Sequence, residues 1–302
     1  MLAPVMTKAR AAHRSEVLAQ LSLVRPSSRS ELVTRTGLSR ATITRITRDL
    51  IRSRFLTEVP GARRSVGRPS QGLEINADYG TVLGISFLPP LARATLMNFR
   101  GAPLEDYSEA LDWSLGAGGL LAALRRLVQR VVKDPALRKR RLSGVGLALP
   151  GQFDKAAGIS RVYPRLADWK DVPLRRQLGG WAGVPAFLIG YAPSIALAEL
   201  TTRSEAPHGL LAIEVTDNIA MGVVANGGLL EGASGNAGEL GHITLERTGG
   251  PCYCGNTGCL ELSTACRSVE EAARKLLKRG ARVPFEAVTE LARGGHAGAA
   301  GL

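Results

Sequence analysis

The sequence has few cysteines and no long apolar segment. Four cysteines in 302 residues do not make a disulfide framework, and no apolar run is long enough to span a bilayer. The first 24 residues have a basic start and a short, broken apolar stretch, without the cleavage pattern of a signal peptide. We therefore expect a soluble, cytoplasmic protein without membrane association, and with room for two or three domains.

Acidic residues are scarce at the start of the chain. Residues 1–70 contain fourteen Lys and Arg but four acidic residues, so this segment carries +10 of the net charge of +13. A basic module on a nearly neutral body is typical of nucleic-acid binding. A generally arginine-rich composition is the alternative explanation, but it would spread the basic residues more evenly.

Apolar spacing and capping residues predict a helix-turn-helix in this basic segment. Apolar side chains at helical spacing over 17–24 predict a first helix that ends before Pro26. Ser30 can cap a short second helix over 31–35. A generic small helical cap is the alternative, but the concentration of basic residues favours DNA binding.

The third helix of this segment carries most of the residues expected to contact DNA. Gly37 supplies the turn, and Ser39 caps a helix that starts at Arg40. Its buried stripe should consist of Ile43, Ile46 and Leu50. The opposite face is polar and basic, so we expect it to enter the major groove. The predicted DNA contacts of this helix and its cap are Ser39, Arg40, Thr42, Thr44, Arg45 and Arg48.

Two short extended pieces around an Arg- and Gly-rich tip follow Leu56. This pattern resembles the wing of a winged helix, and we predict that residues 1–75 form a winged helix-turn-helix domain. Arg68 is expected to contact DNA along a minor groove, where a narrow, negative channel attracts arginine. For Arg63 and Arg64, a solvated basic linker is the alternative.

A histidine and three cysteines lie close together near the end of the chain. One imidazole and three thiols in a short span can close a tetrahedral Cys₃His site. The predicted zinc ligands are His242, Cys252, Cys254 and Cys259. Such a site has no open position for water, so the zinc is expected to be structural. Reduced or buried thiols are the alternative, and Cys266, the remaining cysteine, is expected to be a small core residue.

Two glutamates flank these ligands without being needed as ligands. Glu239 lies before His242, and Glu261 follows Cys259. Two carboxylates beside a structural metal suggest the floor of a pocket for polyhydroxylated molecules. The alternative role is structural, with both side chains supporting the zinc site or helix ends.

The remainder of the chain alternates short β-like runs with helical segments, which predicts an α/β fold. Expected strands are 82–87, 92–98, 144–149, 186–189, 210–215 and 221–225. Expected helices are 119–132, 173–178, 193–201, 269–279 and 285–293. Five segments carry specific patterns: VGLALPGQFD (145–154), DWKDVPL (168–174), GYAPSIALAEL (190–200), VVANGGLLEGASGNAGELGH (223–242) and CYCGNTGCLE (252–261).

These five segments resemble the ROK family (repressors, open reading frames, kinases). The resemblance implies an actin-like (ribonuclease H-like), two-lobed ROK domain over residues 76–302, with lobes of about 76–190 and 191–302. It also implies sugar binding between the lobes, zinc at the four predicted ligands, and Glu239, His242 and Glu261 facing sugar hydroxyls. His242 can contact both the zinc and the sugar, with one ring nitrogen on the metal and the other toward the ligand.

Three parts of the kinase machinery differ from the family's enzymes. Where kinases carry Asp-x-Gly-Gly-Thr, this chain has Ser86–Pro90, whose two prolines remove backbone donors for phosphate. Thr216–Asn218 replaces Gly-Thr-Gly and places Asp217 where a phosphate would lie. Gly190 and Tyr191 replace the Asn-Asp pair, and a phenol is a poor base at neutral pH. We therefore expect no enzymatic activity.

The leading hypothesis is a DNA-binding transcriptional regulator, in the form of a repressor of sugar-metabolism genes. A homodimer or higher oligomer would bind a pseudo-palindromic double-stranded operator, associated with the nucleoid, and sense a sugar or sugar phosphate. The alternatives are a ligand-blind regulator controlled by a protein partner and a sugar kinase with unusual loops. The chain ends soon after a helix, so its C-terminus is expected to be short relative to the family.

Overall fold

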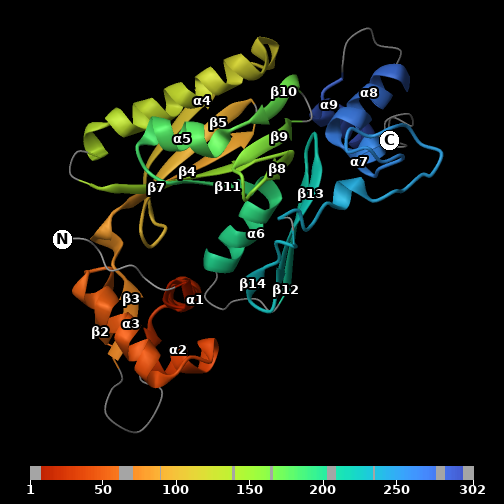
Figure 1. Ribbon diagram of the computed structural model, residues 1–302. Coiled ribbons are helices and arrows are strands. Elements are labelled where there is room, and N and C mark those ends of the chain that lie inside the picture. The colour runs from red at the N-terminus through yellow and green to blue at the C-terminus, as the bar shows by residue number, and fades with distance from the viewer. Residues whose placement is uncertain are drawn as a thin grey trace.

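The computed structural model describes residues 8–60, 71–88, 90–137, 140–163, 166–202, 209–233, 235–276 and 283–294. A small helical domain at the N-terminal end is followed by two α/β lobes (Figure 1). Within these ranges, no helix has both the length and the apolar character that a bilayer crossing needs. Arg63, Arg64 and Arg68 lie outside the described residues.

The N-terminal domain packs three helices against a β-hairpin. Its elements are α1 (Lys8–Leu23), β1 (Ser27–Ser28), α2 (Arg29–Thr36), α3 (Arg40–Arg52), β2 (Leu56–Pro60) and β3 (Gln71–Ile75). Strand β3 pairs antiparallel with both β1 and β2. The core contains Val17, Leu21, Leu32, Ile43, Ile46, Leu50, Leu56, Leu73 and Ile75. The order of helices and the hairpin match the predicted arrangement, including the buried stripe of α3.

Helix α2 begins earlier than the sequence analysis predicts, because Ser28 rather than Ser30 caps it. The Ser28 hydroxyl accepts the backbone N–H of Glu31 at 3.2 Å, and the Glu31 carboxylate accepts the N–H of Ser28 at 2.7 Å. This reciprocal pair satisfies two otherwise free N–H groups. The predicted cap of α3 is confirmed, since the Ser39 hydroxyl accepts the N–H of Thr42 at 3.2 Å.

The first lobe is built on a five-stranded sheet in the order β11-β7-β4-β5-β6. The strands are β4 (Thr81–Leu88), β5 (Leu91–Asn98), β6 (Pro103–Ala110), β7 (Leu142–Leu149) and β11 (Ala186–Gly190). Strands β4, β7 and β11 run parallel, whereas β5 and β6 continue the sheet antiparallel. Helices α4 (Gly116–Lys133) and α5 (Leu174–Ala182) contact each other and the sheet (Figure 1).

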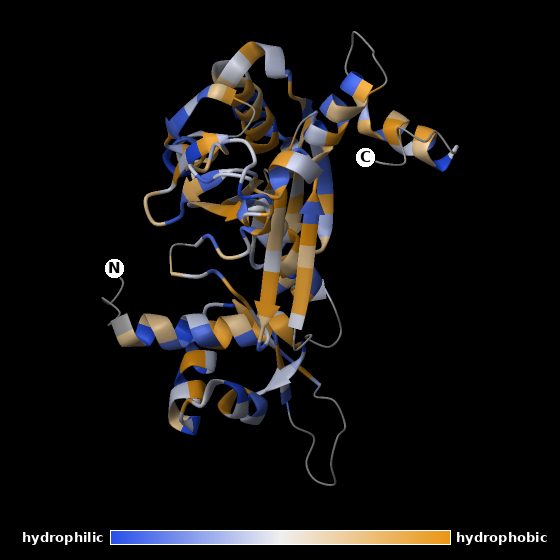
Figure 2. Ribbon diagram, turned by 90° about the vertical axis from the view of Figure 1, so that its right-hand side faces the viewer, coloured by the Kyte–Doolittle hydropathy of each residue, from blue (hydrophilic) through white to orange (hydrophobic). Residues whose placement is uncertain are grey.

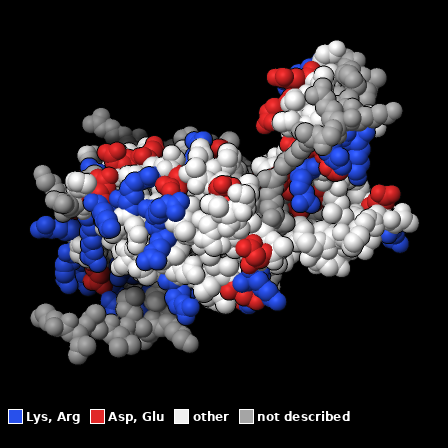
Figure 3. Space-filling model, turned by 90° about the horizontal axis from the view of Figure 1, so that it is seen from above, with Lys and Arg blue, Asp and Glu red and all other residues white. Residues whose placement is uncertain are grey.

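A small second sheet in this lobe, in the order β10-β9-β8, contains β8 (Gln152–Asp154), β9 (Ile159–Tyr163) and β10 (Leu166–Val172). Short 3₁₀ helices occur at η1 (Ala77–Tyr79), η2 (Trp113–Leu115) and η3 (Pro135–Leu137). Basic and acidic side chains lie near one another on the upper face of this lobe (Figure 3). In this lobe Arg126 and Arg130 of α4 both pair with Glu109.

The second lobe is an antiparallel sheet of β12 (Gly209–Val215), β13 (Ile219–Ala225) and β14 (Gly228–Leu229). Helix α6 (Tyr191–Thr202) packs on β13 and β12 and also contacts β7 and β11. The chain continues through η4 (Leu240–His242), α7 (Glu261–Thr264), α8 (Cys266–Leu276) and α9 (Phe285–Arg293). The six strands and five helices expected in the body are present, with ends that differ by a few residues.

Strand β12 exposes an apolar strip on one face. Leu211, Ile213 and Val215 are 62%, 56% and 53% exposed, whereas Glu214 between them is buried. The hydropathy colouring shows the apolar character of the long strands of this sheet (Figure 2). Exposed apolar residues alternate along this edge strand, so one face of the second lobe is not covered by the described residues.

Helix α6 lies close to β13 because Gly222 has no side chain. A Cβ at this position would overlap the carbonyl oxygen of Ala192 and lie 2.7 Å from the Cβ of Ala196. At its far end, α6 meets the N-terminal domain, since Leu23 of α1 packs against a cluster that includes Leu200. Position 222 therefore sets how near the second sheet comes to the helix that touches α1.

We predict that Gly222→Ala lowers the free energy of unfolding by about 1–3 kcal/mol, the usual cost of overpacking. The matched control is Gly118→Ala on α4, where an added Cβ would meet nothing within 4 Å. That control should be neutral or stabilise by up to about 1 kcal/mol. Urea unfolding followed by circular dichroism measures both changes, and equal stability of the two variants would contradict this packing.

Candidate ligand cleft and metal centre

A cleft lies between the two lobes. One wall is made by residues 149–153 after β7 and by Gly190, Tyr191 and Pro193 at the junction of β11 and α6. The opposite wall is made by residues 218–221 of the second sheet, by residues 235–239, and by the side chains of Glu214, His242, Tyr253 and Glu261. Polar groups from both lobes thus line the same cleft.

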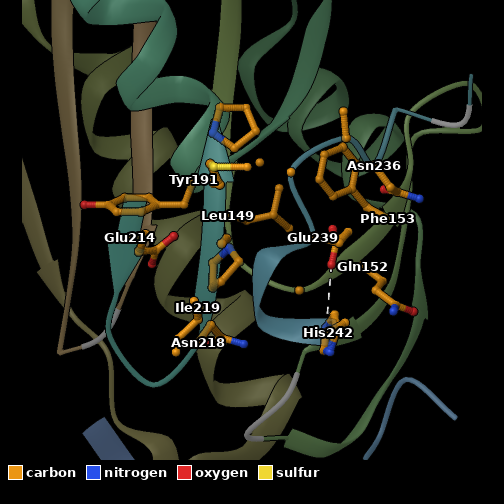
Figure 4. Close-up of a pocket in the computed structure, with 18 of the residues that line it drawn as sticks. Leu149, Gln152, Phe153, Tyr191, Glu214, Asn218, Ile219, Asn236, Glu239 and His242 are labelled. Atoms are coloured by element: carbon orange, nitrogen blue, oxygen red, sulfur yellow. Dashed lines mark ion pairs between the residues drawn. The ribbon is translucent and has the colours of Figure 1, made fainter. Parts of the chain in front are cut away.

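Gly190 and Tyr191 lie on the wall of this cleft, at the end of β11 and the start of α6. The sequence analysis aligned them with the Asn-Asp pair of the kinases. Gly190 offers no side chain and Tyr191 offers a phenol, so this wall has no carboxylate at the helix start. In the close-up, the Tyr191 ring lies over Glu214 (Figure 4).

The two segments that the sequence analysis aligned with the kinase phosphate loops each lie between paired antiparallel strands. Strand β4 continues to Leu88, which pairs with Leu91, and the Phe87 side chain is fully buried in the core. Pro89 lies outside the described residues. Thr216–Asn218 turns β12 into β13, with Val215 paired to Ile219. Among the described residues, Asn218 of the second segment lines the cleft, and none of the first segment does.

Glu239 lies on the cleft wall, where its carboxylate faces His242. The Oε2 of Glu239 lies 3.6 Å from Nε2 of His242, as the dashed line in Figure 4 marks. Burial raises the pKa of Glu239, His242 lowers it, and the negative charge of Glu261 raises it further. The side chain keeps 44% of its surface exposed, so it can reach a molecule in the cleft.

Glu261 is held more firmly than Glu239, because its carboxylate is already used by the protein. It is 6% exposed, and its Oε2 accepts the backbone N–H of Ile219 at 2.9 Å. Burial and then the negative charge of Glu261 raise the pKa of the Tyr253 phenol, which lies within hydrogen-bonding reach of that carboxylate. Glu261 therefore has the structural role that the sequence analysis gave as its alternative, because it holds the backbone of Ile219. It also borders the cleft.

His242 connects the cleft to the cysteine cluster through its two ring nitrogens. Nδ1 lies 3.7 Å from the sulfur of Cys252, whereas Nε2 lies 3.1 Å from the Tyr253 hydroxyl on the cleft side. The Tyr253 ring meets the imidazole edge-to-face, with ring centroids 5.1 Å apart. The imidazole is thus positioned to offer one nitrogen to a metal while the other faces the cleft.

The four predicted metal ligands lie together. One ligand atom from each of His242, Cys252, Cys254 and Cys259 falls within 4.8 Å of all the others. The sulfurs of Cys254 and Cys259 are 3.7 Å apart, close to the separation of about 3.8 Å that metal–sulfur bonds of about 2.3 Å give in a tetrahedron. The arrangement can therefore hold a metal ion.

Local backbone conformation and electrostatics both suit a cation in this cluster. Gly255 and Gly258 have positive φ angles of 92° and 63°, and a Cβ at Gly258 would overlap the carbonyl oxygen of Glu246. Burial and then hydrogen bonds from the neighbouring thiols raise the pKa of Cys259 to about 12, and burial raises the pKa of Cys252. Thiols that keep their protons in the absence of a metal would release those protons when a cation binds.

Cys266 is not the core residue that the sequence analysis expected. It is partly exposed at the start of α8, with its sulfur 3.9 Å from the carbonyl oxygen of Val215, and it lies outside the cluster. Its position after Ala265, at the junction of two short helices, leaves one side open to solvent.

Glu214 is a cleft residue that the sequence analysis missed. It is 5% exposed, and its Oε1 accepts the Thr216 hydroxyl at 3.0 Å. Burial raises its pKa to about 7, while the Thr216 bond lowers it and Glu261 raises it. One signal was in the sequence: an acidic residue in the apolar run 210–215 is unusual in a strand interior and marks a candidate functional group.

Comparison with known proteins identifies the family of this chain. The model of the ROK family matches residues 119–302. The chain belongs to the ROK family. A crystal structure of a ROK family transcriptional regulator, a homologue of the E. coli Mlc protein, superposes with a TM-score of 0.73 at 25% identity, covering 95% of this chain and 76% of that one. The ROK hexokinase of Thermus thermophilus superposes with a TM-score of 0.58 at 31% identity, covering 73% of this chain and 71% of that one.

Curated ROK relatives include proteins named as repressors. A putative xylose repressor of Caldicellulosiruptor sp. (strain Rt8B.4) is 29% identical over 258 residues, which are 85% of this chain and 64% of the relative. The transcriptional dual regulator NagC of Escherichia coli (strain K12) is 27% identical over 276 residues, which are 87% of this chain and 65% of the relative. The chain thus spans about two thirds of the length of these curated relatives.

Proposed function

We propose that the protein is a DNA-binding transcriptional regulator, a repressor of sugar-metabolism genes with a non-catalytic ROK domain. The observation that carries this proposal is an N-terminal domain of three helices and a β-hairpin, with a basic third helix, joined to a ROK domain. The repressor names of several relatives support it.

Helix α3 is the element proposed to enter the major groove of a double-stranded operator. Its buried stripe faces the domain core, so Arg40, Thr44, Arg45 and Arg48 are exposed on the other face. Ser39 and Thr42 lie at its N-terminal end, where free N–H groups favour phosphate. We also propose Arg68 as a minor-groove contact, and a homodimer that places two α3 helices in successive half-sites.

We predict that Arg45→Ala weakens operator binding by about 5- to 150-fold, the usual effect of losing one base-contacting arginine. The control is Arg125→Ala, which removes the same charge from an exposed position on α4 of the first lobe. Fluorescence anisotropy on a duplex selected from random sequences measures both. Wild-type affinity for Arg45→Ala would show that α3 does not read the operator.

Phosphoryl transfer is excluded from the proposal because the cleft lacks the groups that cradle phosphates. Kinases of this kind position nucleotide phosphates with backbone N–H groups of glycine-rich loops. This expectation is supported by the sequence, which has Ser86–Pro90 and Thr216–Asn218 where the kinases have these loops, and Tyr191 where they have an acidic base. We therefore expect no sugar-dependent consumption of ATP.

We also propose that the Cys₃His cluster holds one structural zinc ion, which fixes the position of His242 on the cleft wall. Sulfur and imidazole donors in this number and spacing favour zinc. When bound, the ion would cross-link the 252–259 segment to the 238–242 segment. His242 and Glu239 would then face the cleft in a fixed orientation.

We predict that Cys254→Ser reduces zinc from about one equivalent per chain to near zero, because a tetrahedral structural site does not tolerate loss of a thiolate. Inductively coupled plasma mass spectrometry of the purified protein measures the zinc content. Cys266→Ser is the control and should keep its zinc, since Cys266 lies outside the cluster. A fully metallated Cys254→Ser protein would refute the ligand set.

Helix α6 is the proposed connection between the cleft and the DNA-binding domain. Its first turn lines the cleft through Tyr191 and Pro193. Its later residues Ala196 and Leu200 form a buried cluster against which Leu23 of α1 packs. A ligand that closes the lobes would move α6, and α6 would change the position of α1 and so the spacing of the two α3 helices.

We predict that Leu23→Ala retains operator binding to within about threefold but reduces the effect of an inducing sugar on that binding, because it removes the contact between α1 and α6. Leu18→Ala is the control, since Leu18 lies on the same helix but packs inside the N-terminal domain. Anisotropy titrations with and without sugar measure the coupling. An unchanged sugar effect in Leu23→Ala would exclude this route.

A further inference from the structure

The end of α1 contacts two different parts of the body. Leu23 packs against the apolar cluster of α6 and β13 that contains Leu200 and Val224. Two residues later, the guanidinium of Arg25 donates to the carbonyl oxygen of Arg100 at 2.9 Å, in the turn that joins β5 to β6 of the first lobe. The N-terminal domain therefore meets both α6 and the first lobe at the same helix end.

The β5–β6 turn (residues 98–102) is held in one conformation by its own hydrogen bonds. The side-chain oxygen of Asn98 accepts the backbone N–H of Arg100 at 2.9 Å and that of Ala102 at 3.0 Å. The N–H of Gly101 donates to the carbonyl oxygen of Asn98 at 3.0 Å, and Gly101 has a φ angle of 82°, which favours glycine. The turn is therefore a fixed support for its outermost side chains, and Figure 1 shows it directed toward the N-terminal domain.

Phe99 places its ring from this turn against the N-terminal domain. Together with Phe55, it packs against the core cluster of that domain. The ring centroid of Phe99 lies 5.6 Å from that of Phe55 and 5.4 Å from that of Tyr79, both edge-to-face. Phe55 follows α3 closely, and its carbonyl oxygen accepts the N–H of Asn76 at 2.9 Å. The turn of the first lobe thus contacts the end of the helix that is proposed to read DNA.

Arg100 joins the turn to two further elements of the N-terminal domain. Its Nε donates to the carbonyl oxygen of Ile75 at 2.8 Å, and its guanidinium pairs with the carboxylate of Glu74, both on β3. Its own carbonyl oxygen accepts the bond from Arg25, just after α1. A planar guanidinium with directional donors fixes an orientation as well as a distance, whereas the apolar contact of Leu23 with α6 is non-directional. Of the two contacts, the one through Arg100 therefore determines how the domain is oriented.

We propose that the β5–β6 turn is the pivot that fixes the N-terminal domain to the first lobe, and that Arg100 is a positioning residue for operator binding. The inference rests on the proposed function and deepens it. Because the domain is bonded to the first lobe, a displaced α6 rotates the domain about this turn instead of carrying it along. In a dimer, the orientation of each N-terminal domain sets the distance and the angle between the two α3 helices, and so the half-site spacing that the protein accepts.

Fluorescence anisotropy of the full-length protein on duplexes with altered half-site spacing tests the proposal. The reference duplex carries the two half-sites of the selected operator. The other duplexes have a spacer that is longer or shorter by one or two base pairs, each of which turns one half-site by about 35° relative to the other. We expect the wild type to bind the reference about tenfold or more tightly than the altered duplexes. A wild type that binds every spacing equally would overturn the proposal, since its DNA-binding domains would not be fixed.

Arg100→Ala should reduce this spacing preference by about fivefold or more, because the N-terminal domain can then adopt several orientations. Its affinity for a duplex with a single half-site should stay within about twofold of the wild type, since α3 itself is unchanged. Arg93→Ala is the control, because it removes the same charge from an exposed position on β5, and it should keep the full preference. Glu74→Gln weakens the same ion pair from the other side, so it should lower the preference as well and decides the question if Arg100→Ala does not fold.

The outcomes separate this inference from the proposed function. An unchanged spacing preference in the folded variants, or a loss of affinity for the single half-site as large as for the full operator, would overturn the positioning role. A wild type that binds none of the duplexes would contradict the regulator. Hydrogen exchange without DNA would then still test the pivot: Arg100→Ala should speed exchange in residues 71–79 and leave α4 unchanged, and wild-type exchange rates in 71–79 would overturn the fixed contact.

Discussion

Close packing of α6 onto β13 is the contact on which the rest of the molecule depends. Because Gly222 lacks a side chain, the helix lies directly on the second sheet, with Ala192 and Ala196 facing the strand. The same helix begins on the cleft wall and ends against α1 of the N-terminal domain. Close-packed elements transmit displacement rather than absorb it, so one helix can link the cleft, the lobes and the N-terminal domain.

The cleft keeps the architecture of the ROK kinases but has different chemistry. The side chains of Glu214, Glu239 and Glu261 line it. His242 connects this surface to the cysteine cluster of the 252–259 segment. A surface with these hydrogen-bonding groups suits the hydroxyl-rich ligand that we propose.

Much of the fold was predictable from sequence because its strongest patterns are local. The stripe of α3, the Ser39 cap and the four clustered His and Cys side chains were identified from spacing, and the ROK motifs supplied the body. Strands β6, β8 and β9 were missed because they are short or charged and owe their conformation to pairing with neighbours. Glu214 was missed because its burial, and its approach to Glu261, arise only when distant segments meet.

Hydrogen exchange of the full-length protein, with and without glucose, xylose or N-acetylglucosamine, tests the central claim most directly. That claim is that a free sugar in the cleft changes the position of the DNA-binding domain through α6. The account predicts that a sugar which slows exchange in residues 235–242 also changes exchange in α6 and in the last turn of α1. Slower exchange confined to the cleft, or no effect of any of these sugars, would contradict it.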